Sequence, residues 1–427
     1  MTVSPSSLRT CLLIVAGLTA LLTWLGWNLN AHYGVIVLTH KSDPLGYYQF
    51  LPGVLLHGDW MHLSYTETLD NGNKLSLYTI GVAVLRAPFF LLATGWSYLI
   101  GDEPTGFGLP YYFVHFLGAS LYCSTGLVLL LRVLQRKGST GIAAITIVLL
   151  LFGTNLYFYT VHEAGMSHVY SFFLFAWLLY LTVSMLERPR SSTLLALFFC
   201  GGLILLVRPL NGIALLIPVL YGSAPLEAIR LRLKWVTALP RSTVIGVLIA
   251  LAVVAPQLLY WYQVTGNWLV FTYGTKGQGF NWGSPHLWDI LFSHQGGWLL
   301  YTPIMIGAVA VLLWQAWRNV PGARTILLVL GLAWYIYASW WSWWLGGSFG
   351  HRGFVEHYAL LALPFSSFVQ SAAQWAGPRK RNLLIPAGIL VFLNIRMSLL
   401  AFSPMDGPTW TWDSLLDFWA RAFFMTG

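Results

Sequence analysis

Residues 40–62, "HKSDPLGYYQFLPGVLLHGDWMH", carry two aspartates, three histidines and a pair of tyrosines directly after a long apolar run. That run, "CLLIVAGLTALLTWLGW" (11–27), approaches the roughly 20 apolar residues that a membrane-spanning helix needs. Arg9 precedes it, as in a signal peptide, but no small-residue cleavage site follows, so we predict a retained first span. A segment rich in Asp, His and Tyr therefore begins just after a membrane helix.

The composition is that of a membrane protein along its whole length. Of the 427 residues, 57% are hydrophobic and only 9% are charged, whereas about a quarter of the residues in a soluble protein are charged. The net charge of +9 does not indicate nucleic-acid binding, because the basic residues are scattered over short loops. The three cysteines lie in apolar runs and have neither disulfide nor metal-ligand spacing. We predict one integral-membrane domain, residues 1–427.

Basic residues indicate which ends of the spans face the cytoplasm. The apolar runs that could span lie at 10–28, 112–131, 140–158, 169–186, 192–207, 210–222, 241–261, 298–316, 324–343, 358–375 and 383–401. The intervening connections that hold most of the basic residues are 132–137, 187–190, 227–241, 317–324 and 378–381. By the positive-inside rule, these connections and the amino terminus are cytoplasmic. We predict an all-α polytopic membrane protein with about eleven transmembrane helices.

Two outer regions complete this topology. Residues 29–110 form a long first extracytoplasmic loop with juxtamembrane helices, and residues 402–427 form an amphipathic tail on the outer leaflet. Within the loop, 75–100 is long enough to span, but a span there would move every later basic connection to the outside. Arg86 and Pro88 near its middle also oppose a plain span. We expect a helix that lies along the outer leaflet or dips into it.

Polar chemistry is concentrated on the outer side of this topology. All acidic residues except Glu187 and Glu227, and all histidines except His115, fall in extracytoplasmic segments. Solvated loops collect polar residues in any protein. The inner loops here, however, are short and basic, whereas the outer loops combine His, Asp, Glu, Trp and Gly. We therefore expect an active site on the extracytoplasmic face.

Asp43 is the first candidate for a catalytic residue. Pro44 favours an extended conformation at Asp43, and a carboxylate near the membrane surface, beside the substrate-binding candidates Tyr47 and Tyr48, can act as a general base. The same Asp–Pro pair is also a good helix start, in which Asp43 would only cap the helix. Asp59 lies in a similar setting and is a candidate for substrate binding.

A second polar segment is "VHEAGMSH" (161–168), where the chain enters the membrane again. Met166 occupies the place of the second histidine of an HExxH motif, so the segment gives little support for zinc. We consider His162, Glu163 and His168 as residues that bind substrate through hydrogen bonds. The alternative is that they form the ordinary polar start of a helix.

A third segment, "GGSFGHRGFVEH" (346–357), places Arg352 just before a span, between His351 and Glu356. Arginine binds phosphate oxygens with a planar fork of donors, so this segment is a candidate contact for a lipid phosphate or pyrophosphate. The alternative is a local pair of Arg352 with Glu356 on the following helix. Arg208 in "LVRPLN" interrupts apolar sequence, where a charge is costly and usually functional. The remaining substrate-binding candidates are Arg86, Lys276 and His294.

Several nucleotide-dependent and hydrolytic motifs are missing from the sequence. It contains no Walker A motif, no G-x-G-x-x-G after a strand and no G-x-S-x-G elbow. An enzyme that works on the outer face without nucleotide must draw an activated substrate from the membrane. A group linked to polyprenyl phosphate meets that need.

The order of these segments resembles the GT-C glycosyltransferases, integral-membrane enzymes that use polyprenyl-phosphate sugars. The segments that carry the resemblance are "SDPLGYYQFLP", "YTIGVAVLRAPFFLLA", "FGTNLYFYTVHEAGMSHVYSFFLFA", "VRPLN", "LFSHQGGWLLYTPI" and "GGSFGHRGFVEHYALLALP". They are distributed over most of the chain and are similar to those of bacterial members. The resemblance implies a multi-pass protein of the bacterial cytoplasmic (inner) membrane, with its active site toward the periplasm.

The same resemblance implies a mechanism and partners. It implies that Asp43 deprotonates the acceptor in an inverting displacement, and that Arg352 and Arg208 bind the lipid phosphate. The residues it places around the cavity are His162, Glu163 and His168. The implied partners are a polyprenyl-phosphate sugar and a glycan, lipid or protein acceptor. The first loop lacks an Asp-x-Asp pair, so we predict no cofactor and leave a divalent metal open.

Three other functions compete with this one. A lipid-linked oligosaccharide polymerase or ligase would also use arginines on the outer face, with a pyrophosphate donor. A flippase or transporter would suit the intramembrane arginines, although no internal repeat is visible. A non-catalytic scaffold is the third alternative.

Overall fold

The computed structural model describes residues 5–30, 42–61, 63–222, 224–374, 378–401, 405 and 409–424. The longer helices are α1 (Pro5–Asn30), α5 (Gly81–Leu99), α6 (Leu109–Gln135), α7 (Thr140–Phe152), α9 (Ser167–Glu187), α10 (Ser191–Val207), α12 (Pro225–Ala238), α13 (Pro240–Thr265), α16 (Met305–Trp317), α17 (Ala323–Ser339), α18 (Tyr358–Ala373), α19 (Pro378–Leu400) and α20 (Trp412–Phe424). The short helices are α3 (Asp43–Tyr48), α4 (Phe50–Leu55), α8 (Leu156–Val161), η1 (Pro209–Leu215), α11 (Leu216–Leu220), η2 (Thr272–Lys276), α14 (Asp289–Phe292), α15 (Trp298–Tyr301) and η3 (Arg352–Phe354). The strands β1 (Glu67–Thr68) and β2 (Lys74–Leu75) form one antiparallel hairpin.

The predicted all-α polytopic fold is confirmed. Among the described residues, five helices are long and apolar enough to cross a membrane, and six further apolar helices are shorter. Parts of the predicted first outer loop (31–41 and residue 62) and of the tail (402–404, 406–408 and 425–427) lie outside the described residues.

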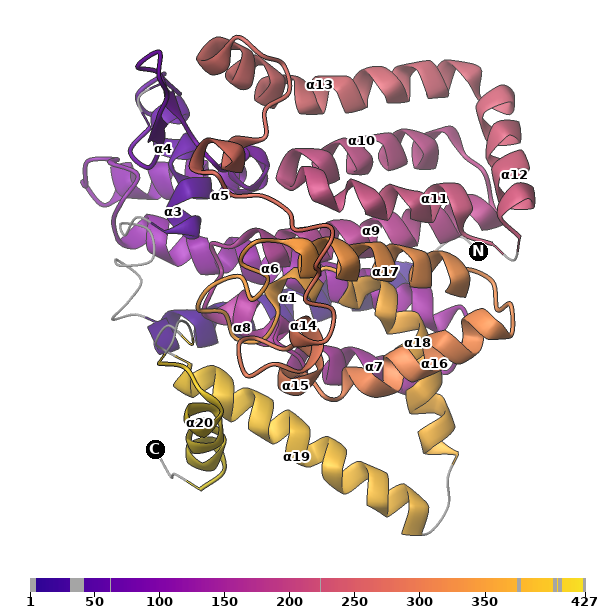
Figure 1. The fold of residues 1–427 in the computed structure, drawn as a ribbon. Helices are drawn as coiled ribbons and strands as arrows, with labels where there is room; N and C mark the ends of the chain where they lie inside the picture. The colour runs from indigo at the N-terminus through magenta and orange to yellow at the C-terminus, as the bar shows by residue number, and fades with distance from the viewer. Residues whose placement is uncertain are drawn as a thin grey trace.

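The long helices run side by side, and the basic connections gather at one end of the bundle (Figure 1). Arg136, after α6, forms an ion pair with Glu187 at the end of α9 (3.1 Å). The neighbouring Lys137 donates a hydrogen bond to the Tyr221 hydroxyl after α11 (3.2 Å). Three connections from different parts of the sequence thus meet, and α12 lies across the same end. The opposite end carries α3, α4 and the longer loops.

Helices α9 and α13 differ in how much of their surface is buried within the protein. In α9, 72% of the most apolar window is buried in the protein, whereas in α13 the figure is 11%. A helix that is apolar all round and buried belongs in the middle of a bundle. α9 packs against α6 and α10, while α13 covers α10 from outside and leaves an apolar face for lipid.

Helix α5 stays at the end of the bundle opposite the basic connections. Its first residue, Gly81, packs against the backbone of Leu206 and Val207 at the end of α10. Trp96, near its other end, contacts Phe113 at the start of α6. Both ends of α5 therefore lie at the same end of the bundle. By length and composition α5 is one of the five helices that could cross a membrane, so its placement in one leaflet stays a prediction.

The tail helix α20 is amphipathic and packs on the protein with one face. Leu415, Phe418 and Ala422 are buried, and the Trp410 indole just before the helix donates to the backbone oxygen of His294 (3.0 Å). The apolar side chains that stay exposed are Trp412, Leu416, Phe423 and Phe424. This pattern suits a helix between the protein and a lipid surface, and the position of 402–427 on the outer leaflet stays a prediction.

Candidate active site

Asp43 lies at the start of α3, where both of its carboxylate oxygens are bound. Ser42 is the N-cap residue in an extended conformation, and Pro44 pre-sets the first turn. Oδ1 of Asp43 accepts a hydrogen bond from the Tyr78 hydroxyl (2.6 Å). Oδ2 forms an ion pair with Nη2 of Arg352 (3.0 Å). The capping position belongs to Ser42, so the alternative role of Asp43 as the N-cap is wrong.

Gly46 allows the Tyr78 ring to reach Asp43. A Cβ atom added at Gly46 would overlap the ring of Tyr78. The absence of a side chain there lets the ring lie across α3 and bring its hydroxyl to the carboxylate. Tyr78 also packs edge-on against Tyr47, with ring centroids 5.0 Å apart.

We expect Gly46→Ala to disturb the site more than the fold. The methyl group would push the Tyr78 ring away from Asp43, and overpacking of this kind costs about 1–3 kcal/mol. Any reaction in which the Asp43 carboxylate accepts a proton should slow about tenfold or more, because a general base acts only from a well-aligned position. The control is Gly331→Ala in α17, where nothing lies within 4 Å of an added Cβ. Equal activity of the two variants would contradict this role of Gly46.

Arg352 is presented by a loop that is fixed at several points. Gly350 has a positive φ of 63°, and a Cβ there would lie 3.0 Å from the Cβ of Tyr301. The Asn155 amide donates to the backbone oxygen of Phe349 (2.9 Å). Glycine is needed at position 350 for both its conformation and its close packing. The loop therefore places the guanidinium of Arg352 at a defined position over Asp43.

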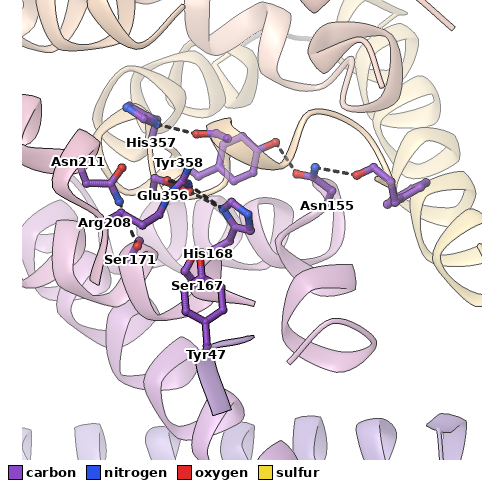
Figure 2. Close-up of polar contacts among 12 residues, drawn as sticks. Tyr47, Asn155, Ser167, His168, Ser171, Arg208, Asn211, Glu356, His357 and Tyr358 are labelled. Atoms are coloured by element: carbon purple, nitrogen blue, oxygen red, sulfur yellow. Dashed lines mark hydrogen bonds and ion pairs between the residues drawn. The ribbon is translucent and has the colours of Figure 1, made fainter. Parts of the chain in front are cut away.

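A second ion pair lies beside the first, and Figure 2 shows its members. Arg208 follows the last residue of α10, where Pro209 begins η1. Its Nη1 binds Oε1 of Glu356 (2.7 Å), and Nδ1 of His168 lies 3.1 Å from Oε2 of the same carboxylate. Glu356 is fully buried. The alternative local pair of Arg352 with Glu356 is wrong, because each residue pairs with a partner far away in the sequence.

The charges around Glu356 decide its protonation state. Burial alone would raise the pKa of this carboxyl, but the Arg208 guanidinium and then His168 outweigh the effect, so its pKa is lowered. Glu356 is therefore ionised at neutral pH. Its negative charge balances the positive charge of Arg208 inside the protein.

Tyr47 lies close enough to both ion pairs to be influenced by the charges of Arg208, Asp43 and Arg352. Its hydroxyl donates to Oγ of Ser167 at the start of α9 (3.3 Å; Figure 2). Burial raises the pKa of Tyr47, while the positive charges of Arg208 and Arg352 oppose the shift. The phenol therefore stays neutral and close to both arginines.

Glu163 faces the first ion pair from the connection between α8 and α9. Burial raises the pKa of Glu163 to about 7, with Arg352 opposing the shift and Asp43 reinforcing it. At neutral pH the carboxyl is therefore close to half protonated. Such a group can donate or accept a hydrogen bond to a substrate.

The structure adds two tyrosines that the sequence did not single out. Tyr78 binds Asp43 directly. Tyr273 in η2 lies near enough to the site to be influenced electrostatically by Tyr47, Asp43, Arg208 and Arg352. Tyr78 begins one of the segments quoted from the sequence, but nothing in the local pattern distinguishes either residue from the rest of the chain's 21 tyrosines.

Seven of the predicted candidates come together: Asp43, Tyr47, Glu163, His168, Arg208, Arg352 and Glu356. Among the described residues, no group of three His, Cys, Asp or Glu side chains is placed to hold a metal ion. The two carboxylates with the clearest geometry are instead bound to guanidinium groups.

Two histidine candidates hold the protein together. His162 contacts the side-chain oxygen of Asn30 at the end of α1 (3.2 Å), which ties the first span to α8. His351 contacts the backbone oxygen of Trp343 (2.8 Å) and closes the loop before Arg352. Both rings are buried. These two contacts hold structural elements together.

Arg86 and Tyr48 lie together in the interior. Nη2 of Arg86 contacts Nδ1 of His115 (2.7 Å), and the guanidinium lies 4.8 Å from the ring centroid of Tyr48. The Tyr48 hydroxyl donates to the backbone oxygen of Gly106. These contacts anchor Tyr48, the last residue of α3, in the protein interior.

The remaining candidates lie at the periphery. Oδ1 of Asp59 accepts from the backbone of Met61 (2.6 Å) in the turn after α4. Lys276 pairs with Glu67 of the hairpin (2.6 Å), with both side chains one-third exposed. His294 contacts the tail, as described above.

Comparisons with known proteins connect this chain to others through its fold. No protein-family model matches it, and no curated protein sequence matches it. ArnT from Cupriavidus metallidurans bound to undecaprenyl phosphate is similar in structure, with a TM-score of 0.52 and 12% identity, over 96% of this chain and 76% of that chain. The archaeal oligosaccharyltransferase AglB from Archaeoglobus fulgidus, in complex with an inhibitory peptide and a dolichol-phosphate, has a TM-score of 0.50 and 10% identity.

The AglB similarity covers 96% of this chain and 56% of AglB, so this chain spans little more than half of that protein. At these identities the similarity establishes a common fold. The GT-C fold predicted from the sequence is confirmed.

Proposed function

We propose that this protein transfers a sugar from a polyprenyl-phosphate donor to an acceptor hydroxyl. The observation that carries the proposal is the pair of Asp43 and Arg352 at 3.0 Å, in which a base and a phosphate-binding cation lie side by side and partly exposed. Support comes from the shared fold, since ArnT and AglB were solved with undecaprenyl phosphate and with a dolichol-phosphate.

The reaction is a single displacement at the anomeric carbon. The acceptor oxygen forms a bond to that carbon while the bond from the carbon to the phosphate oxygen breaks. The electron pair leaves with polyprenyl phosphate, and the acceptor proton passes to Asp43. Tyr78 orients the carboxylate through its hydrogen bond to Oδ1.

The two arginines supply the electrostatic part of the mechanism. The donor phosphodiester carries one negative charge, and the departing phosphate carries more. Arg352 and Arg208 compensate this developing charge, a contribution that is often the largest in such reactions. Tyr47, Glu163 and Tyr273 complete the surroundings in which the sugar and acceptor are bound.

The proposed orientation places this site on the extracytoplasmic face of a bacterial cytoplasmic membrane. The basic connections lie at the other end of the bundle, and the positive-inside rule assigns them, with the amino terminus, to the cytoplasm. The whole of 1–427 then acts as one GT-C-like domain. The ion pairs lie near one end of the helices rather than at the midplane, where a transporter binds its cargo, so an enzyme is favoured over a flippase.

The configuration of the product tests the single displacement. With a donor of known anomeric configuration, proton NMR of the isolated product should show the opposite configuration at the anomeric carbon. Retention would require a covalent glycosyl intermediate and would contradict the role given to Asp43.

The pH dependence of donor binding tests Glu163. Because its pKa is about 7, Glu163 is largely neutral below pH 7 and adds a negative charge beside Arg352 above it. The affinity for a diester donor, whose own charge is constant, should therefore fall about three- to tenfold between pH 6 and pH 8. Glu163→Gln should flatten this dependence, whereas Glu187→Gln at the other end of the bundle should keep it. The same slope in the Glu163→Gln variant would exclude this assignment.

A further inference from the structure

The two arginine–carboxylate pairs differ in how firmly they are held. In the Arg208–Glu356 pair the carboxylate is 0% exposed, and in the Arg352–Asp43 pair it is 34% exposed. A pair open to water gains little from its attraction and exchanges partners readily. A buried pair resists separation, because either charge left alone in the interior is strongly unfavourable.

Glu356 is bound at both of its oxygens, which fixes Arg208. Oε1 binds Arg208 at 2.7 Å, and Oε2 is 3.1 Å from His168, itself buried. The neighbouring Asn211 amide donates to Ser171 (3.1 Å; Figure 2), so the turn after Arg208 is tied to α9 as well. Arg208 is one-fifth exposed and can present its remaining donors to a ligand without moving.

Asp43 has a second partner that does not depend on Arg352. The Tyr78 hydroxyl donates to Oδ1 at 2.6 Å, whereas Arg352 binds Oδ2. If Arg352 leaves, Tyr78 keeps the carboxylate in position and Oδ2 becomes free to accept a proton. Arg352 is itself 23% exposed, so a phosphate group can approach its outer donors.

We propose that the two arginines have divided roles, with Arg352 exchanging its partner during the reaction. This inference rests on the proposed function. Without ligand, Arg352 occupies Asp43. When the donor binds, Arg352 passes to the lipid phosphate and releases Oδ2, while Arg208 remains fixed by Glu356 and His168. The base is then available only after the donor is bound, so donor binding precedes activation of the acceptor.

A double-mutant cycle tests the exchange directly. The full-length protein in detergent is titrated with undecaprenyl phosphate at constant pH, and Kd is measured for wild type, Asp43→Asn, Arg352→Gln and the double variant. Asp43→Asn should bind about three- to tenfold more tightly, because Arg352 no longer has a competing carboxylate. Arg352→Gln should bind more weakly, and the gain from Asp43→Asn should disappear in its background.

Two results would overturn the inference. One is unchanged or weaker binding by Asp43→Asn with an intact fold, judged by thermal unfolding. The other is a gain that persists in the Arg352→Gln background, since the removal of a negative charge alone would then explain it. If Asp43→Asn fails to fold, Asp43→Ser replaces it in the same cycle.

Matched variants separate this inference from the proposed function. Asp417→Asn removes an exposed Asp–Arg pair of the same 3.0 Å length in α20 and should leave Kd unchanged. Glu356→Gln should weaken binding, because Arg208 loses its anchor. The cycle contains no sugar. Absence of transfer with every donor would contradict the proposed function, whereas additive effects of the two substitutions on Kd in an enzyme that transfers sugar would contradict only the exchange.

Discussion

Asp43→Asn is expected to lower the rate of sugar transfer by about 10³-fold or more without weakening donor binding. The substitution keeps the shape of the side chain and its contact with Tyr78 but removes the only described proton acceptor that is both bound to Arg352 and partly exposed. Turnover is measured as polyprenyl phosphate released from a saturating donor in the presence of acceptor.

The control for this variant is a second aspartate of the same outer loop. Asp102 is exposed in the turn after α5 and has no described contact with the ion pairs. Asp102→Asn should therefore transfer sugar at the wild-type rate. Wild-type turnover in Asp43→Asn would eliminate the assignment of the base.

Arg352→Gln is expected to have the second largest effect, a loss of about 10²- to 10³-fold in turnover. The guanidinium compensates the charge that develops on the departing phosphate, and a neutral amide cannot replace it. Arg352→Lys should restore only part of the activity, because an ammonium keeps the charge without the planar fork of donors.

The comparison for Arg352 is Arg421, which pairs with Asp417 on the surface of α20. Arg421→Gln should leave turnover unchanged. If Arg352→Gln were as active as Arg421→Gln, the lipid phosphate would have to bind elsewhere, with Arg208 as the next candidate.

The sequence predicted the class of fold well because the bilayer imposes simple rules. Span lengths and the alternation of basic connections follow from hydrophobic thickness and from charge. These arguments depend on local composition, which a single sequence displays in full.

The pairing inside the candidate site could not be predicted in the same way. The sequence offered Arg352 and Glu356 as neighbours on one helix, four residues apart. In the structure Arg352 lies in η3 before the helix begins, so the two side chains diverge. Glu356 reaches Arg208 and Arg352 reaches Asp43, and such long-range pairs are fixed by tertiary packing, which local spacing does not encode.

The sequence also could not show which polar residues contact other protein groups and which are left for a substrate. His162, His351 and Arg86 are substrate-binding candidates in the sequence. The structure gives each a partner inside the protein. A polar residue that satisfies another protein group and one that awaits a substrate carry the same signal in a single sequence.

The most direct test of the central claim is a donor assay with the purified wild-type protein. A panel of polyprenyl-phosphate sugars is incubated with the protein and a membrane extract that supplies acceptors, and the released polyprenyl phosphate and the modified acceptor are followed by mass spectrometry. We predict release and transfer with at least one donor, both lost in Asp43→Asn. Binding of the donors without release from any of them would contradict the claim that this protein is a glycosyltransferase.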